Sequence, residues 1–304
     1  MLAGVVLAGG VALGIHHVRA SAQDARGTIR VDGRERTYTL HLPTGYDGTK
    51  AVPLVLALHG RLGTGEGQER LGHFDQTSDG HGFIVVYPDG LDRSWADGRG
   101  ASPSDTKGID DVKFLSELID KVSGTYKIDP ARVYATGMSN GGFMSGRLAC
   151  ELAGKIAAVG IVGASLSPKV ANRCHPEKPV SVLILQGTKD PLVPFGGGPL
   201  GKNGSRGEAL SHEAAVQKWV EINGCSNQVE RKHIPDSARD GTSLEIVTYS
   251  GCKGGTQVVG YTVEKGGHTW PGGMQYLPSA LVGKTSRNLD ASETIWEFFE
   301  REHR

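Results

Sequence analysis

The sequence lacks an excess of charge of either sign. Lysine plus arginine number 33 and aspartate plus glutamate number 33 among 304 residues, so the formal net charge is zero. A chain without net charge has no long-range field that would draw it to nucleic acid or to an anionic membrane surface. We therefore expect no nucleic-acid partner and favour small neutral or mildly charged substrates.

The sequence also lacks internal repeats and any linker rich in threonine, proline or serine. A linker of that kind would indicate a second module. The length suits one large α/β domain with a generous core and leaves little room for a second full domain. We predict a single domain over residues 23–304 and no obligatory protein partner.

The N-terminus lacks the basic residues that usually begin a signal peptide, because Leu2 follows Met1 directly. It does contain an apolar stretch, Leu2–Ile15, followed by an A-x-A cleavage pattern at Ala20-Ser21-Ala22. We predict a signal peptide over residues 1–22, and hence a secreted or periplasmic protein. A membrane-anchored N-terminus and a misassigned start are the alternatives.

Cysteine is scarce, and the four cysteines include no C-x-x-C spacing, so we predict no metal site. An even number of cysteines in an exported chain favours two disulfides over four buried thiols. Of the three possible pairings, we favour Cys150 with Cys174 and Cys225 with Cys252. Each bond would close a local excursion and remove about 3–4 kcal/mol of unfolded-state entropy.

Hydrophobic patterns predict the strands. Two alternating runs, Thr28–Val31 and Arg36–Leu42, flank Asp32-Gly33 and indicate a hairpin at a sheet edge. Five short apolar runs, each ending near Gly, His, Pro or Ser, are typical of buried parallel strands. These runs are Val52–Leu58, Phe83–Tyr87, Arg132–Thr136, Ala157–Val162 and Val180–Gln186.

Helical patterns lie between several of these strands. The segment Asp110–Val122 begins with two aspartates, which suit a helix N-terminus better than an acid/base pair, and its apolar residues share one face. Asp290 with Glu293 indicates the cap of a C-terminal helix. Strands alternating with helices predict the α/β class: a mostly parallel central sheet with an N-terminal antiparallel hairpin and helices on both faces. The Gly-rich segment Pro194–Gly207 is predicted to be a mobile surface loop.

A short motif indicates nucleophilic catalysis. Gly137-Met138-Ser139-Asn140-Gly141 matches G-x-S-x-G, follows a predicted strand and precedes a helix-like run. That context is the nucleophile turn of the α/β-hydrolase fold, where glycines allow a tight bend that exposes the serine. An ordinary Gly/Ser turn is the alternative, but we predict that Ser139 is a nucleophile.

A serine hydroxyl needs a histidine to take its proton and a carboxylate to orient that histidine. In this fold the chain order is Ser, Asp or Glu, His. Asp190 lies in a turn after a predicted strand, and His268 lies in a Gly-rich loop after the strand-like run Gln257–Val263. We predict Asp190 as the acid and His268 as the base, with Asp236 or Asp240 as the rival acids.

The tetrahedral intermediate needs two N–H donors, each contributing roughly 3 kcal/mol. Asn140 follows the nucleophile directly, and the loop after the strand ending at Leu58 is the usual source of the second donor. We predict the backbone N–H groups of Asn140 and Arg61. His59, in the same loop, is expected to shape it through backbone hydrogen bonds and to border the substrate, rather than to act as a base.

Together these residues resemble a known family, the polyhydroxybutyrate depolymerase-like esterases, which are similar to feruloyl and acetyl xylan esterases. The resemblance implies a secreted carboxylic-ester hydrolase that needs no cofactor and uses the triad above. It covers nearly all of the chain after residue 22 and rests on five ordered motifs: Leu58-His59-Gly60, Tyr87-Pro88-Asp89-Gly90, Gly137–Gly142, Gly187-Thr188-Lys189-Asp190-Pro191 and Gly267-His268-Thr269-Trp270-Pro271.

The chain departs from the family in two ways. Members that degrade solid polyester often carry a linker and a polymer-binding domain, which are not found here, and some have a cysteine where this chain has Arg61. Both departures favour soluble esters or oligomers. Trp270, close after the histidine, and Trp95 are expected to offer aromatic walls to a phenolic ring or a sugar face, with loop packing as the alternative.

The predicted function is hydrolysis of hydroxyalkanoate oligomers or of feruloyl and acetyl esters through an acyl-enzyme. A serine peptidase would share the triad but commonly adds a domain or an acidic clamp for the substrate amine, and neither is evident. A non-catalytic binding protein on the same fold would have lost a triad residue, and all three are present. A lipase is disfavoured because the hydrophobic fraction is 38% and no long apolar lid is evident.

Overall fold

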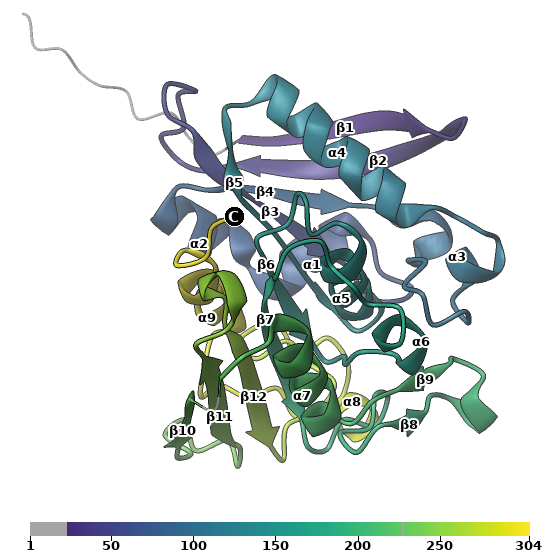
Figure 1. Cartoon of the computed structure of the whole chain (residues 1–304), viewed down its shortest axis with the longest axis vertical. Helices are drawn as coiled ribbons and strands as arrows, with labels where there is room; N and C mark the ends of the chain where they lie inside the picture. Colours follow the sequence, from purple (N-terminus) through teal and green to yellow (C-terminus); the bar gives the residue numbers. More distant parts are fainter. Residues whose placement is uncertain (1–22, 227) are drawn as a thin grey trace, which may run out of the picture.

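A ten-stranded sheet forms the centre of the molecule (Figure 1). The computed structural model describes residues 23–226 and 228–304, so the predicted signal peptide lies outside the described residues. The strand order is β1-β2-β4-β3-β5-β6-β7-β12-β11-β10. The strands are β1 (Gln23–Val31), β2 (Arg34–Leu42), β3 (Val52–Leu58), β4 (Ile84–Pro88), β5 (Ile128–Met138), β6 (Ala158–Val162), β7 (Ser181–Gly187), β10 (Gln228–Ile234), β11 (Ser243–Ser250) and β12 (Val258–Glu264).

The middle of the sheet is parallel and both of its sides are antiparallel. Strands β4, β3, β5, β6, β7 and β12 run parallel to one another. The predicted N-terminal hairpin is present as β1 and β2, which pair antiparallel with each other and extend the sheet beyond β4. At the other side, β11 and β10 continue it antiparallel from β12. The mostly parallel sheet that the sequence predicts is confirmed.

Helices cover both faces of the sheet, as Figure 1 shows for α4, α5 and α7 on one face and α1, α2 and α9 on the other. Successive strand residues point to opposite faces, so β3 gives Leu54 and Leu56 to the first face and Val55 to the second. The helices are α1 (Gly65–Gly72), α2 (Phe74–His81), α3 (Pro103–Thr106), α4 (Asp111–Thr125), α5 (Asn140–Glu151), α6 (Pro168–Ala171), α7 (His212–Asn223), α8 (Ser279–Val282) and α9 (Ala291–Phe299).

The predicted helix starts are present. Asp110 caps α4 by accepting from Lys113 N at 2.9 Å. Asp290 caps α9, accepting from the backbone N–H groups of Ser292 and Glu293. The second aspartate of the first pair, Asp111, is buried and forms an ion pair of 2.7 Å with Arg36 of β2, so the two aspartates are structural.

One segment differs from the expectation. The Gly-rich stretch predicted as a mobile loop carries a small hairpin, β8 (Gly198–Pro199) with β9 (Glu208–Ala209). Leu200 N donates to Gly207 O at 2.8 Å, and Arg206 N donates to Leu200 O at 2.9 Å. These backbone bonds give the segment a defined path.

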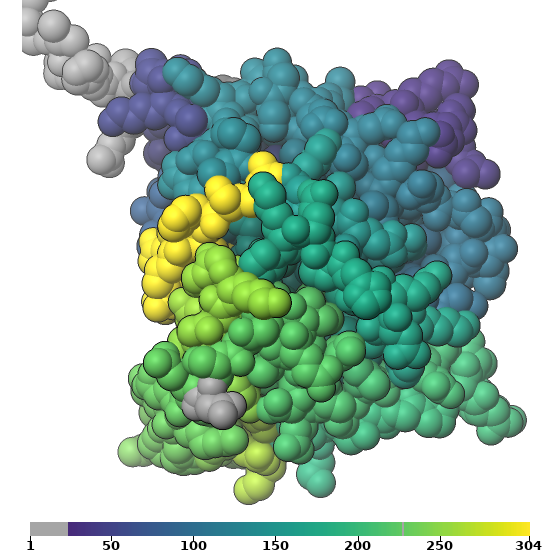
Figure 2. All heavy atoms as spheres, in the orientation of Figure 1, coloured from purple at the N-terminus to yellow at the C-terminus, as the bar shows by residue number. Residues whose placement is uncertain are grey.

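Two disulfides and a backbone bond at the C-terminus connect separate segments of the fold. The disulfides are Cys150–Cys174 and Cys225–Cys252, the pairing that the sequence favours. The C-terminal segment, yellow in Figure 2, packs against the body of the molecule. Arg304 N donates to Ala131 O near the start of β5. Among the described residues, no helix combines the length and hydropathy needed to span the membrane.

Candidate active site

Ser139 sits on a sharp turn between β5 and α5. Its backbone is in an unusual conformation for a residue with a side chain, with φ 56° and ψ −119°. The turn packs tightly against β3: a Cβ on Gly141 would lie 2.2 Å from Leu58 O, and one on Gly137 would lie 2.7 Å from the same atom. Only glycine fits at these two positions, and this explains the G-x-S-x-G pattern physically.

Asp190 and His268 form a buried pair beside this turn. Asp190 Oδ2 lies 2.7 Å from His268 Nδ1, and both side chains are almost wholly buried. The other carboxylate oxygen accepts from Leu192 N and Val193 N, each at 2.8 Å. Because the carboxylate accepts at Nδ1, the neutral imidazole carries its proton there and presents an unprotonated Nε2.

The rival acids lie in a different environment. Asp236 accepts from Gly241 N at 2.8 Å, and Asp240 accepts from Thr242 N at 2.8 Å. Both also accept from the Asn288 side chain, so they tie their loop to the segment around Asn288. Neither makes a hydrogen bond to His268 in the described part of the chain. The geometry therefore favours Asp190 as the partner of His268.

Glycines bring the histidine loop against the sheet. A Cβ on Gly267 would lie 2.1 Å from Val282 O, and one on Gly187 would lie 2.3 Å from Gly266 O. At the end of β6, Gly163 has a φ of 55°, and a Cβ there would lie 3.4 Å from His268 Nδ1. The loops after β6, β7 and β12 can meet at one point because these positions lack side chains.

A cavity of about 490 Å³ opens where these loops converge. Ser139 and His268 both line it, and so do Arg61, Asn140 and His59. Ser139 Oγ makes no hydrogen bond within the described part of the chain. The hydrogen bond between a catalytic serine and its histidine commonly tightens only when substrate binds. Much of the remaining wall is apolar and comes from Leu62, Leu71, Leu192, Val193, Leu200, Met274, Tyr276 and Leu277.

The two predicted oxyanion donors both border this cavity. Asn140 is the first residue of α5, where backbone N–H groups have no partner within the helix. Arg61 follows Gly60, whose Cβ position is 3.5 Å from Ser139 Cβ. Within residues 23–226 and 228–304, neither the Asn140 nor the Arg61 backbone N–H donates to a protein acceptor. Both donors are thus available to a ligand beside Ser139.

His59 has the backbone contacts that the sequence predicts. Its Nε2 accepts from Gly90 N at 3.0 Å, and its Nδ1 lies 2.8 Å from Gly60 O. A carbonyl oxygen can only accept, so Nδ1 carries the proton and the ring is neutral. Burial lowers the pKa of His59, which keeps it in that form. The side chain holds the loop of Arg61 in place and borders the cavity.

The two tryptophans do not line the cavity, so the prediction that they offer aromatic walls to the substrate is wrong in this structure. Trp270 is fully buried against Phe74, and its Nε1 donates to Ser292 Oγ of α9 at 3.1 Å. Trp95 is also fully buried, and its Nε1 donates to His59 O at 2.9 Å. Each indole buries a large apolar area while satisfying its one donor, so packing accounts for both.

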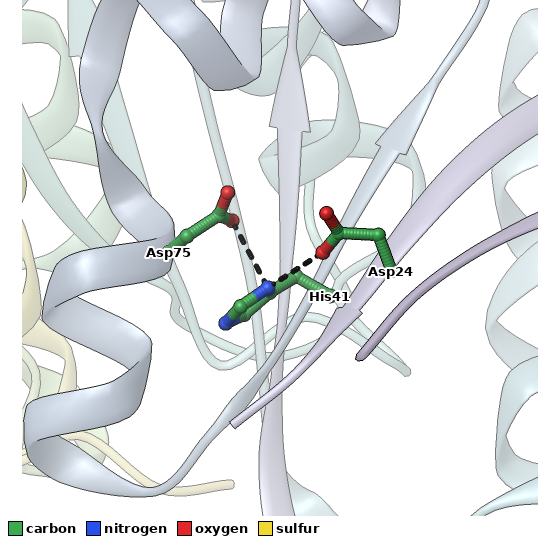
Figure 3. Close-up of side chains that lie close together, drawn as sticks. All are labelled: Asp24, His41 and Asp75. Atoms are coloured by element: carbon green, nitrogen blue, oxygen red, sulfur yellow. Dashed lines mark hydrogen bonds and ion pairs between the residues drawn. The ribbon is translucent and has the colours of Figure 1, made fainter. Parts of the chain in front are cut away.

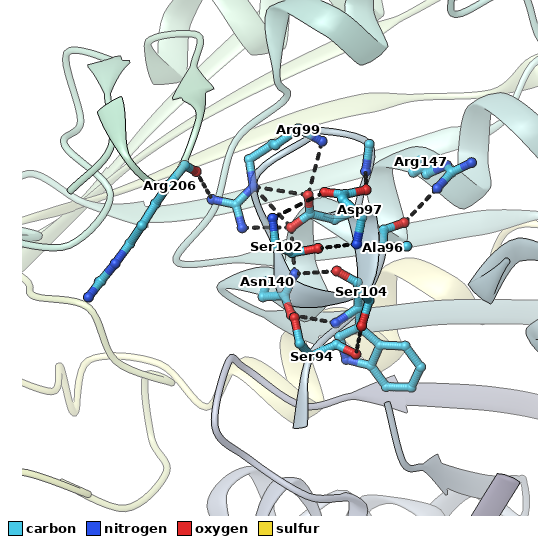
Figure 4. A network of polar contacts seen from close by, with 12 residues as sticks. Ser94, Ala96, Asp97, Arg99, Ser102, Ser104, Asn140, Arg147 and Arg206 are labelled. Carbon is cyan, nitrogen blue, oxygen red and sulfur yellow. Dashed lines mark hydrogen bonds and ion pairs between the residues drawn. The ribbon is translucent and has the colours of Figure 1, made fainter. Parts of the chain in front are cut away.

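Sequence reasoning missed a polar network that holds Asn140 (Figure 4). The Asn140 side chain accepts from Trp95 N at 2.7 Å and donates to Asp97 Oδ2 at 2.5 Å. Asp97 forms a buried ion pair of 2.6 Å with Arg99, whose guanidinium lies 4.1 Å above the Phe143 ring. Complete burial raises the pKa of Asp97 although Arg99 opposes that shift. The bonds of Asn140 to Trp95 and Asp97 connect residues 45 and 43 positions apart, and no local motif predicts them.

Tyr276 was also missed. Its hydroxyl donates to His268 O at 3.1 Å, and its side chain lines the cavity. Burial, with a smaller contribution from Asp190, raises the pKa of Tyr276 to about 12, so the hydroxyl keeps its proton at neutral pH. It follows His268 by eight residues in an irregular segment, and its position gives no periodic signal.

One group of described side chains is close enough to hold a metal ion: Asp24, His41 and Asp75 (Figure 3). His41 Nδ1 lies 2.8 Å from Asp24 Oδ1 and 3.8 Å from Asp75 Oδ1. Asp75 also accepts from Tyr87 Oη at 2.7 Å. Burial lowers the pKa of His41, but the surrounding carboxylates outweigh it and raise the pKa overall. These contacts form an ion-pair cluster between the hairpin and α2, and none of its residues lines the cavity.

Comparison with known proteins gives consistent results. The family model described as "Esterase PHB depolymerase" matches residues 36–174. "Putative esterase NocK" of Nocardia uniformis subsp. tsuyamanensis is 33% identical over 294 residues, which are 92% of this chain and 84% of that protein. "Feruloyl esterase D" of Neurospora crassa is 30% identical over 287 residues, 90% of this chain and 84% of that protein.

A solved structure supports the same fold. The acetyl xylan esterase from Aspergillus awamori superposes with a TM-score of 0.56 at 14% identity, covering 91% of this chain and 99% of that one. At this identity the likeness concerns the fold alone. The α/β-hydrolase architecture that the sequence predicts is therefore confirmed.

Proposed function

The chain belongs to the PHB depolymerase family of esterases, and we propose that Ser139, His268 and Asp190 carry out its ester hydrolysis through an acyl-enzyme. Its relatives are named as esterases, and it is a carboxylic-ester hydrolase. The observation that carries the proposal is the buried Asp190–His268 bond of 2.7 Å beside a cavity that Ser139 also lines. This family membership also favours ester over peptide hydrolysis.

In the first half of the reaction, Ser139 Oγ attacks the ester carbonyl carbon and His268 Nε2 takes the hydroxyl proton. The carbonyl oxygen becomes an oxyanion and accepts from the N–H groups of Arg61 and Asn140. When the carbon–oxygen bond of the alcohol breaks, His268 returns the proton to the leaving alkoxide. Asp190 keeps the imidazole in the required tautomer and stabilises its cation throughout.

In the second half, water attacks the acyl-enzyme carbonyl while His268 takes one of its protons. The bond to Ser139 Oγ breaks, the serine regains its proton from His268, and the free acid leaves. Every transferred proton passes through His268, between Ser139, the leaving alcohol and water. No step calls for a cofactor.

We propose soluble substrates: hydroxyalkanoate oligomers, or feruloyl and acetyl esters of polysaccharides. A cavity of about 490 Å³ is of the size that takes a small acyl or alcohol group. The relative named a feruloyl esterase supports an aromatic acid as one candidate. The buried positions of Trp95 and Trp270 remove the two indoles from that argument, so Tyr276 and the aliphatic side chains of the wall are left to make the contact.

Secretion and domain organisation complete the proposal. Two disulfides are typical of proteins that fold in an oxidising compartment. We propose that residues 23–304 form one catalytic domain and that residues 1–22 are removed on export. N-terminal sequencing of the exported protein checks this, because the proposal expects a start close to Gln23.

The experiment is a rate comparison of the protein and its Ser139→Ala variant on methyl ferulate, a 3-hydroxybutyrate oligomer and an acetylated xylo-oligosaccharide. We expect a preference for one of the three and a fall of at least about 10⁴-fold in kcat for the variant. Equal hydrolysis by both proteins would overturn the mechanism, and no hydrolysis of any ester would overturn the substrate class.

A further inference from the structure

The catalytic cavity has positively charged arginines in its wall and no carboxylate among the described residues, although the net charge of the protein is zero. Three arginines line it, Arg61, Arg99 and Arg206. No aspartate or glutamate side chain lines it in the described part of the chain. A cavity with charges of one sign and apolar walls concentrates ligands of the opposite sign.

The three arginines differ in how they are bound. Arg99 is almost fully buried, donates to both oxygens of Asp97 through Nε, and lies over the Phe143 ring. Its role is structural. In contrast, the guanidinium groups of Arg61 and Arg206 make no ion pair or hydrogen bond with any described residue. Both side chains are solvent-exposed at the cavity wall.

Arg206 has a fixed backbone and an unengaged side chain. Its carbonyl oxygen accepts from Arg99 Nη1 at 3.2 Å, and its N–H donates to Leu200 O. Gly207 packs on Arg99, since a Cβ there would be 3.0 Å from Arg99 Cβ. Figure 4 shows the Arg206 side chain pointing away from this network. The buried Asp97–Arg99 pair therefore anchors the β8–β9 hairpin, and the hairpin in turn holds the Arg206 guanidinium at the cavity.

The surroundings of these cations are apolar. Six large hydrophobic side chains are exposed by more than a third among the described residues, and four of them line this cavity. These four are Leu62, Leu192, Met274 and Leu277. A ligand that matches the wall would have a hydrocarbon body and an anionic end.

We propose that the enzyme selects esters that carry a free carboxylate, which Arg206 binds with help from the Arg61 side chain. The inference rests on the proposed function and narrows its substrate class to anionic esters, such as an oligomer of a hydroxy acid with its free acid end. Guanidinium binds carboxylate through two parallel hydrogen bonds, and this geometry favours arginine over lysine.

The test compares two substrates that differ only in charge, p-nitrophenyl hydrogen adipate and p-nitrophenyl methyl adipate, with nitrophenolate release as the readout. We expect a higher kcat/KM for the anion, and we expect Arg206→Gln to lower the anion-to-neutral ratio roughly tenfold. Added salt should lower the same ratio. Arg231→Gln, which removes an exposed arginine of β10, is the matched control and should leave the ratio unchanged.

A binding measurement separates this inference from the proposed function. Calorimetry with the Ser139→Ala variant compares monomethyl adipate with dimethyl adipate, without any need for turnover. Tighter binding of the anion, lost in Ser139→Ala/Arg206→Gln, supports the inference even if catalysis proceeds differently. Equal binding of both esters, no binding of either, or a kcat/KM ratio that Arg206→Gln does not change overturns it.

Discussion

At the scale of single residues, the carboxylate of Asp190 accepts three hydrogen bonds, two from backbone N–H groups and one from His268 Nδ1. An amide in its place could not accept at both positions and also keep the proton on His268 Nδ1. We expect Asp190→Asn to lower kcat by about 10⁴-fold with a small change in KM.

The matched control for that variant is Asp236→Asn, because Asp236 is the rival acid and its hydrogen bonds come from Asp240 N, Gly241 N and the Asn288 side chain, with none to His268 in the described structure. It should retain full activity. Steady-state kinetics on one ester decide between them, and an equal loss in both variants would contradict the assignment.

His212 makes the stability of the fold sensitive to acid. Its ring stacks on Phe195 with 4.9 Å between centroids, and within the described residues neither ring nitrogen has a hydrogen-bond partner. Burial lowers the pKa of His212 to about 4. Between pH 6.5 and 4 the unfolded chain therefore binds a proton that the folded chain excludes, so the free energy of unfolding falls as pH falls.

We expect this one group to cost on the order of 3 kcal/mol of stability between pH 6.5 and 4. Urea unfolding across that range should show a flatter pH dependence for His212→Gln than for the unmodified protein. His175→Gln, at an exposed histidine, is the control and should leave the slope unchanged. An identical slope in all three proteins would rule out His212 as the cause.

At the scale of elements, the turn between β5 and α5 depends on the absence of side chains at two positions. A Cβ on Gly141 would meet the backbone of β3, which cannot move without disturbing the centre of the sheet. We expect Gly141→Ala to lose about 2–3 kcal/mol of stability and most of the activity.

Gly80 of α2 provides the comparison, because a Cβ there meets nothing within 4 Å. Gly80→Ala should leave activity unchanged and raise stability by up to about 1 kcal/mol, since alanine favours a helix. Thermal unfolding with an activity assay measures both variants. If Gly141→Ala behaved like Gly80→Ala, close packing would not be the reason for the glycine.

Elements with a strong local signal could be predicted from the sequence, and others could not. The apolar run of β3 and the motif around Ser139 have short-range patterns, so their positions were predicted to within a residue or two. In contrast, β10 is exposed along nearly its whole length and shows no apolar run. It forms because β11 presents a free edge, and such pairing depends on the whole fold.

The same distinction applies to the site. The order of Ser139, Asp190 and His268 and the turns around them were visible in the sequence. The structure bonds Asp190 to His268 and places Ser139 and His268 on one cavity. The burial of Trp95 and Trp270 could not be read from the motifs, because it depends on contacts with other parts of the chain. An example is the hydrogen bond from Trp270 to Ser292 of α9. The bond from Asn140 to Asp97 was missed for the same reason, because 43 residues separate them.

At the scale of the whole molecule, two disulfides close loops with sequence separations of 24 and 27 residues. Loops of this length remove about 3–4 kcal/mol of unfolded-state entropy for each bond. We expect Cys150→Ala/Cys174→Ala to reduce the free energy of unfolding by about that amount, measured by urea titration. Reduction of the unmodified protein should have a larger effect, and no loss in either case would contradict the entropic account.

The central claim is that one serine, Ser139, forms the acyl-enzyme. The most direct measurement is labelling with a fluorophosphonate, in which Ser139 Oγ bonds to phosphorus and fluoride leaves, followed by mass spectrometry and an ester assay. We predict one label per chain, on the peptide that contains Ser139, with hydrolysis lost in proportion and no label on Ser139→Ala. Full hydrolysis by the labelled protein, or a label on another residue that accounts for the lost activity, would contradict the account.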